Sequence, residues 1–241
     1  MSVVLNERLK KAASLVGTFS GFAENESCVL SKAPIVACDV GCDHAYLSLH
    51  LVLSGRCDRV IASDLRQGPL ASAQANIRAH GCENQIHTVL TDGLDGLEGL
   101  GITDAVICGM GGDTMIDILS RASFLKKRGT RLILQPQSAF AELALYLAGE
   151  GFHIVTERYA LEHRKPYRII GAVFCGSEQI LSHKEALVGS PSFEEDREAY
   201  TAFCNKILNT IEKKIGGAKR TQSDTSYLDA LYRDIVLSMN V

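Results

Sequence analysis

The stretch that decides the fold runs from residue 35 to residue 47 and reads IVACDVGCDHAYL. It begins as an apolar, β-branched run, turns at Gly41 and continues into residues typical of a helix, which predicts a strand, a tight turn and a helix. The same alternation repeats along the chain. The five predicted strands are residues 35–39, 59–63, 86–90, 105–108 and 131–134. This repeat predicts an α/β fold with a parallel sheet covered on both faces by helices.

The last two predicted strands are connected differently. A helix over residues 139–150 is followed by strands over 152–162 and 167–175, with only residues 163–166 between them. Because a parallel crossover needs a dozen residues or more, this short link predicts a hairpin and an antiparallel last strand. Before the first strand, apolar residues at helical spacing predict an amphipathic helix over residues 5–16, ended by Gly17 and Gly21.

The C-terminal part has a different pattern. Residues 176–191 are predicted to be a linker, and residues 192–195 (SFEE) form a plausible capping box ahead of a helix. Two apolar stripes, over residues 200–215 and 228–239, predict two helices packed as an antiparallel hairpin or small coiled coil, with Gly216-Gly217 ending the first. We therefore expect a main domain over residues 1–180 and a helical hairpin over residues 181–241.

The composition is that of a soluble globular protein. The chain has 241 residues, of which 46% are hydrophobic and 22% are charged. No apolar run reaches the roughly 20 residues of a membrane span, and the first residues lack the apolar core of a signal peptide, so we expect a cytoplasmic protein. The eight scattered cysteines fit reduced thiols better than a disulfide framework. A net charge of −3 neither demands nor excludes a nucleic-acid partner, because local basic patches decide that affinity.

Polar or small residues follow the predicted strands, and ligands of open α/β sheets bind at that edge. Asp39 can meet an ammonium group, and Gly41 lets the backbone turn sharply. Asp64 is placed like an acceptor for ribose hydroxyls, although an acid after a strand is often only a helix cap. The pair at 92–93, Asp-Gly, can reach the amine of an adenine ring, but it is also a common turn.

A nicotinamide cofactor does not fit this pattern. Its glycine signature requires small residues where this chain has Asp43 and Tyr46, so an anionic pyrophosphate would meet a carboxylate. S-adenosylmethionine carries no phosphate and brings a positive sulfonium and ammonium, which makes an acidic lining favourable.

Three stretches together resemble the bacterial tRNA adenine-N1 methyltransferases that modify adenosine 22 in the D-arm: DVGCDHAYL at 39–47, GMGG at 109–112 and LILQPQ at 132–137. The likeness covers residues 5 to about 175 in order, and the C-terminal hairpin matches that family's architecture. The resemblance implies a Rossmann-like class I methyltransferase sheet. It also implies transfer of a methyl group from S-adenosylmethionine to N1 of a tRNA adenosine. Cys42, Asp64 and Gln137 depart mildly from the family pattern, where Ser, Glu and Asn are expected.

The resemblance also implies roles for individual residues. Asp43 is expected to stabilise the cationic methylated ring or to bind the cofactor, with His44 beside it; the alternative is that Asp43 caps the next helix and His44 packs in its first turn. Residues that act directly on the reaction are expected to be Asp43, His44, Gln135 and Gln137. Residues expected to bind S-adenosylmethionine are Asp39, Gly41, Cys42, Asp43, His44, Asp64, Leu65, Asp92, Gly93, Gly109, Met110 and Gly111.

Basic clusters indicate where a long substrate binds. Most Lys and Arg residues are solvated surface, but those at the predicted hairpin tip and helical turn are best placed to meet phosphates. The residues expected to bind substrate are Gly112, Pro136, Arg164, Lys165, Lys213, Lys219 and Arg220. No base-reading code is visible, so recognition by shape is expected. We expect tRNA as the partner, no membrane, and a monomer.

A metal site is not expected, although Cys38, Cys42, Asp43 and His44 lie close together. Cys38 belongs to a buried strand, and no second Cys or His pair has zinc spacing.

Two competing functions stay open: a small-molecule methyltransferase, and a non-catalytic RNA-binding protein that retains the sheet. Intact Asp39, Gly41, Asp64 and Asp92 speak against the second of these.

Overall fold

A computed structural model describes residues 3–18, 34–190 and 196–239. Seven strands form one sheet in the order β3-β2-β1-β4-β5-β7-β6, with β1 to β5 parallel and β7 antiparallel to both of its neighbours. The strands are β1 (Val36–Val40), β2 (Arg59–Asp64), β3 (Ile86–Leu90), β4 (Asp104–Met110), β5 (Arg131–Pro136), β6 (Phe152–Glu162) and β7 (Lys165–Phe174). The predicted α/β class with an antiparallel last strand is confirmed.

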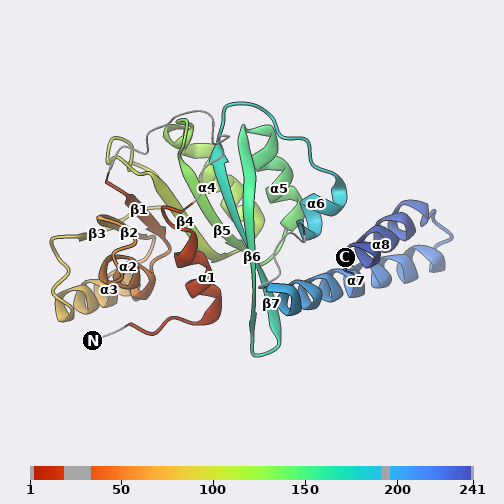
Figure 1. Ribbon diagram of the computed structural model, residues 1–241, viewed down its shortest axis with the longest axis horizontal. Coiled ribbons are helices and arrows are strands. Elements are labelled where there is room, and N and C mark those ends of the chain that lie inside the picture. The colour runs from red at the N-terminus through yellow and green to blue at the C-terminus, as the bar shows by residue number, and fades with distance from the viewer. Residues whose placement is uncertain (1–2, 19–33, 191–195, 240–241) are drawn as a thin grey trace.

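Helices cover both faces of the sheet (Figure 1). One hydrophobic cluster packs α1, α2 and α3 on one face, and a second packs α4 and α5 on the other. The helices before the C-terminal part are α1 (Glu7–Leu15), α2 (Tyr46–Leu53), α3 (Gln67–Ala79), α4 (Gly112–Arg121), the 3-10 turn η1 (Ser123–Leu125) and α5 (Phe140–Gly149). Because β1 to β5 are parallel, the loops after them meet at one edge of the sheet.

The β6–β7 hairpin projects beyond that edge, at the bottom of Figure 1. Its turn consists of His163 and Arg164, which have φ angles of 47° and 66°. Positive φ at both central residues is the pattern of a two-residue type I′ turn, whose twist matches that of the flanking strands. The hairpin is therefore two residues tighter than the predicted link, and Lys165 begins β7 instead of lying in the turn.

Two helices after the sheet form an antiparallel pair that extends away from it in Figure 1: α7 (Arg197–Arg220) and α8 (Ser226–Met239). Their prediction as a hairpin is confirmed, but the prediction that Gly216-Gly217 ends the first helix is wrong. The helix continues to Arg220 because packing of Ile211 and Ile215 against the partner elements outweighs the cost of about 1 kcal/mol per helical glycine. The capping box predicted at 192–195 lies outside the described residues, and Asp196 precedes α7.

The predicted linker at 176–191 contains a helix, α6 (His183–Val188), so this prediction is partly wrong. Ser182 and Glu185 form a capping box, but a helix of only six residues is too short to show apolar periodicity. The buried Arg168 side chain bonds Glu157 at 2.6 Å and the carbonyl of Ala186 at 2.7 Å, which fixes α6 against β6 and β7. None of the described helices combines the length and apolar character that crossing a bilayer requires.

Candidate active site

The loop after β1 is held in an unusual backbone conformation. Gly41, Asp43 and Ala45 have φ angles of 75°, 48° and 58°. A Cβ on Gly41 would lie 2.6 Å from the Met110 methyl group, so a glycine is needed both for the turn and for the contact with the end of β4. The Gly41 amide donates to the carbonyl of Ser63 at 2.8 Å, which fixes the loop over the end of β2.

Asp43 and His44 lie on the exposed rim of this loop. His44 Nε2 is 3.7 Å from Asp43 Oδ2, and the His44 ring is tilted against Tyr46 with 5.7 Å between centroids. The alternative in which Asp43 caps the following helix is wrong, because the N-cap of α2 is Ala45 and no side chain caps it. His44 also precedes this N-cap and is exposed, so the alternative in which it packs in the first turn of the helix is wrong as well.

Asp39 is a buried carboxylate at the end of β1, with 5% of its surface exposed. Burial raises the pKa of Asp39 to about 6, and a hydrogen bond from Ser48 Oγ at 2.6 Å opposes the increase. Within the described part of the chain, Asp39 forms no ion pair. At neutral pH the group is therefore mostly an ionised carboxylate that lacks a cation.

Asp64 ends β2 beside it and is also buried. Its carboxylate accepts hydrogen bonds from the backbone amides of Asp43 at 3.2 Å and Arg66 at 2.9 Å, which fix its orientation. Thus Asp64 links the loop after β1 to the start of the turn into α3. The next residue, Leu65, is 65% exposed and places an apolar surface on the rim of the site.

Asp92 and Gly93 follow β3, where they have structural partners. Arg121 of α4 lies 3.4 Å from the exposed carboxylate of Asp92 and also pairs with Asp95. Gly93 has a φ of 60°, and a Cβ there would lie 2.8 Å from Ile118. Packing against α4 therefore explains the glycine, and contact of this pair with an adenine ring stays a prediction.

The glycines at the end of β4 and after it differ from one another. Gly109 is exposed with a φ of 83°, and Gly111 is the N-cap of α4. Gly112 is buried, and a Cβ on it would lie 2.5 Å from the carbonyl of Ala139. The absence of a side chain at Gly112 thus permits close packing of α4 on the chain before α5, and its contact with substrate stays a prediction.

The end of β5 holds the two predicted glutamines, and the first of them contacts Arg8, which the sequence did not predict. Gln135 is fully buried: its Oε1 accepts from Arg8 Nη1 at 2.6 Å, and its Nε2 donates to the carbonyl of Pro136 at 2.8 Å. Both ends of this amide are therefore occupied, whereas Gln137 is exposed and its backbone amide bonds Met110. Of the two glutamines, Gln137 is the one whose side chain is available to a ligand.

Arg8 of α1 lies at the site in contact with residues of four strands, β4, β5, β6 and β7. Its guanidinium lies 5.4 Å from the ring centroid of Tyr167, and a Cβ on Gly109 would be 3.2 Å from its Nη1. Its backbone amide donates to the Glu162 carboxylate. The Nε donor is buried and has no hydrogen-bond partner among the described residues. No local pattern marks Arg8, because its partners come from distant parts of the chain.

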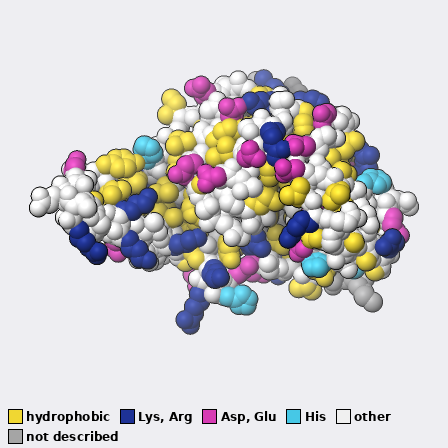
Figure 2. Space-filling view, turned by 180° about the vertical axis from the view of Figure 1, so that it is seen from behind, with side chains coloured by type: hydrophobic (Ala, Val, Ile, Leu, Met, Phe, Trp, Pro, Cys, Tyr) yellow, Lys and Arg dark blue, Asp and Glu magenta, His cyan; other side chains and the backbone are white. Residues whose placement is uncertain are grey.

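The basic residues predicted to bind substrate lie on two separate elements. Arg164 and Lys165 are exposed at the hairpin tip, and Lys213, Lys219 and Arg220 are exposed on α7. Figure 2 shows Lys and Arg side chains along the lower side of the helical hairpin and at the projecting tip. The fold therefore places both clusters on one side of the molecule without joining them.

The thiols near the site are protonated at neutral pH. Burial raises the pKa of Cys42 and Cys108 to about 12, and the neighbouring Asp39 adds to the increase. Among the residues that the structure describes, no three His, Cys, Asp or Glu side chains form a group able to hold a metal ion.

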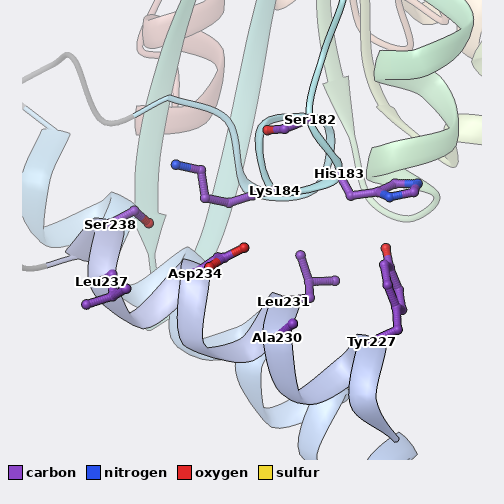
Figure 3. Close-up of a pocket in the computed structure, with 9 residues that line it drawn as sticks. All are labelled: Ser182, His183, Lys184, Tyr227, Ala230, Leu231, Asp234, Leu237 and Ser238. Atoms are coloured by element: carbon purple, nitrogen blue, oxygen red, sulfur yellow. The ribbon is translucent and has the colours of Figure 1, made fainter. Parts of the chain in front are cut away.

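A cavity of about 680 Å³ lies elsewhere, between α6 and α8 (Figure 3). His183 and Tyr227 meet edge to face at one end of it, with 5.5 Å between ring centroids. It contains none of the residues predicted from the sequence to form the site, and no loop from the parallel strand ends lines it.

Comparison with known proteins identifies the family. A family model described as a methyltransferase domain matches residues 26–170. The chain belongs to this methyltransferase family. Its matched region contains the strand ends β1 to β5 described above, and the resemblance carried by residues 39–47, 109–112 and 132–137 is confirmed.

Individual relatives of this methyltransferase domain are similar over long stretches. The tRNA (adenine(22)-N(1))-methyltransferase of Bacillus subtilis is 32% identical over 138 residues, covering 57% of this chain and 58% of the relative. A candidate tRNA methyltransferase of Mycoplasma pneumoniae is 28% identical over 192 residues, covering 78% and 87%. A Streptococcus pneumoniae structure, a candidate tRNA (m1A22) methyltransferase in complex with S-adenosyl-L-methionine, has a TM-score of 0.75 and 29% identity, covering 98% and 100%.

Proposed function

We propose that this chain transfers the methyl group of S-adenosylmethionine to N1 of an adenosine in tRNA, at position 22 of the D-arm. The observation that carries the proposal is the buried Asp39 carboxylate, which lies near the carboxyl end of β1 in a methyltransferase domain and forms no ion pair with a described residue. The choice of tRNA and of position 22 is supported by the names of the relatives from Bacillus subtilis and Streptococcus pneumoniae.

The residues at the strand ends fit S-adenosylmethionine. Asp39 is an ionised, buried partner for its ammonium group, and Asp64 presents a fixed carboxylate for ribose hydroxyls. Leu65 offers an apolar contact for the adenine ring, which Asp92 is proposed to meet at its amine. The loop of Gly41 to His44 and the residues Gly109 to Gly111 complete the proposed cofactor site.

This reaction needs little general acid–base catalysis from the protein's own residues. S-adenosylmethionine, when bound, supplies an electrophilic methyl group, and adenine N1 is already a nitrogen nucleophile. The protein therefore has to expose the base and align N1, which is work of positioning. We propose that the exposed Asp43 carboxylate stabilises the positive charge that develops on the ring, and that Gln137 contacts its edge.

Arg8 and Gln135 act as positioning residues in this proposal. The guanidinium of Arg8 lies against the tip of β4 and holds the buried Gln135 amide at the tip of β5. The two strand ends that flank the proposed slot for the base are thus joined through one side chain. A rigid slot favours productive alignment, because small errors in position cost large factors in rate.

The partner and location follow from the same proposal. We propose a monomeric, cytoplasmic enzyme whose main domain, residues 1–180, performs the methyl transfer, while the helices in residues 181–241 help to hold tRNA. The exposed Arg164 and Lys165 at the hairpin tip, and Lys213, Lys219 and Arg220 on α7, are proposed to meet phosphates.

The test is incubation of the protein with S-adenosylmethionine and unmodified tRNA, followed by nucleoside analysis. We expect N1-methyladenosine, and none from a transcript in which adenosine 22 is replaced by guanosine. Binding of S-adenosylmethionine without any salt-sensitive binding of tRNA would instead favour a small-molecule methyltransferase. Binding of tRNA without the cofactor would favour a non-catalytic RNA-binding protein.

A further inference from the structure

A second hollow, of about 610 Å³, lies between α1 and β6, outside the residues proposed for catalysis and cofactor binding. Four of its lining side chains are cations and one is an acid, and three more carry hydroxyl groups. The lining residues are Glu7, Lys10, Lys11, Ser14, Leu15, Thr18, Arg56, Thr156 and Arg158. We call this hollow the α1–β6 groove.

The cations of the groove retain donors for a ligand. Lys10 pairs with Glu7 at 2.6 Å, and Lys11 pairs with the buried Asp196. Arg56 donates to the carbonyl of Ser14 at 3.2 Å and forms no ion pair with a described residue. An ammonium group has three donors and a guanidinium has five, so these contacts leave several donors of Lys10, Lys11 and Arg56 unused.

The groove begins next to the proposed slot for the base. Glu7 lines one end of the groove, and its neighbour Arg8 lies against Gly109. From there the groove follows α1 to its far end, where Arg56 lies. Nine helical residues span about 14 Å, which matches roughly four nucleotides of a stacked strand at about 3.4 Å each.

We propose that the α1–β6 groove binds the sugar–phosphate backbone of the tRNA strand that carries the target adenosine. This inference rests on the proposed function. The cations are spread along the groove over α1, the loop after α2 and β6, which suits a row of phosphates better than a single small anion. The Thr156 hydroxyl is a neutral donor of the kind that contacts phosphates, whereas the hydroxyls of Ser14 and Thr18 already donate to backbone carbonyls of α1.

The test uses a variant that removes the charge of two groove cations and leaves the residues at the ends of β1 to β5 unchanged. The variant Lys10→Gln/Arg56→Gln is compared with Arg78→Gln/Lys127→Gln, which removes the same charge from exposed positions on α3 and before β5. Binding of a tRNA transcript is measured by fluorescence anisotropy over a range of salt concentrations. Methylation kinetics, cofactor affinity and thermal unfolding are measured on the same proteins.

We expect the groove variant to lower the slope of log affinity against log salt by about 1.4–1.8, from two lost phosphate contacts of about 0.7–0.9 each. If those contacts contribute nothing near 1 M salt, affinity at 0.1 M falls by about 25-fold or more. The Michaelis constant for tRNA should rise in proportion, while kcat at saturating tRNA and cofactor affinity stay within twofold. The control variant should bind like the wild type.

Three outcomes overturn the proposal. Equal losses in the groove and control variants indicate an effect of net charge, and an unchanged groove variant shows that this surface does not touch RNA. If inorganic phosphate protects the groove lysines Lys10 and Lys11 from acylation and tRNA does not, the groove is a small-anion site. In all three cases, the proposed function still holds if the wild-type protein produces N1-methyladenosine. A wild type that neither binds nor methylates tRNA overturns both proposals.

Discussion

Replacing Asp39 by asparagine is expected to stabilise the free protein and to weaken its binding of S-adenosylmethionine. The amide has nearly the shape of the carboxyl group, and its oxygen still accepts the hydrogen bond from Ser48. The substitution therefore removes a buried charge and little else. Opposite effects on stability and binding are expected because the folded protein holds an ionised carboxylate in a place suited to a cation.

The size of the effect on stability follows from the pKa. Burial raises the pKa of Asp39 from an ordinary 3.8 to about 6, although the Ser48 hydroxyl opposes the increase. At 1.36 kcal/mol per pKa step, this difference corresponds to about 3 kcal/mol. The folded state binds the proton more tightly than the unfolded state, so this group's favourable contribution is complete below pH 3.8 and is lost as pH rises through about 6. Asparagine removes this loss.

The assay is urea unfolding of the cofactor-free protein at low and high pH. We expect the free energy of unfolding of Asp39→Asn to exceed that of the wild type by up to about 3 kcal/mol above pH 7 and to equal it near pH 4. In calorimetry, S-adenosylmethionine should bind the variant about ten- to a hundredfold more weakly, and its affinity for the wild type should fall as pH decreases through about 6. An exposed control on α8, Asp234→Asn, should change neither property. Equal cofactor affinity in the two proteins, or a less stable variant at high pH, would refute the reasoning.

Three further variants test other contacts. Arg8→Met leaves the buried oxygen of Gln135 without its donor and should lower the free energy of unfolding by about 1–3 kcal/mol and reduce kcat/KM for tRNA; an unchanged kcat/KM would exclude a positioning role. Arg168→Met leaves the buried Glu157 carboxylate without its cation and should lower the free energy of unfolding in urea by about 3–5 kcal/mol. The double variant Arg168→Met/Glu157→Leu should recover most of this loss, and equal losses in both variants would contradict this account. Asp43→Asn should reduce kcat at saturating cofactor and tRNA about tenfold, whereas a normal kcat would remove Asp43 from the reaction.

The sequence predicts those features whose causes are local. Alternation of apolar runs and helical stretches gives the sheet, and the rule that ligands bind at the carboxyl ends of strands selects Asp39 and Asp64. The continuous α7 could not be predicted from Gly216-Gly217, because tertiary packing against α8 sets its length. Arg8 could not be predicted either, since its contacts join residues 127 and 154 positions apart in the chain.

The long-range attachment of α1 also determines when the site can be completed during synthesis. This helix is made before the sheet, and the partners of its side chains and backbone, Gln135, Glu162 and Asp196, follow 127, 154 and 185 residues later. Because a chain is made from its N-terminus at about 5–20 residues per second, α1 waits for many seconds before these partners exist. The helix can therefore dock fully only when most of the chain has left the ribosome. A nascent chain that already has the parallel strands still lacks the arginine that joins the ends of β4 and β5.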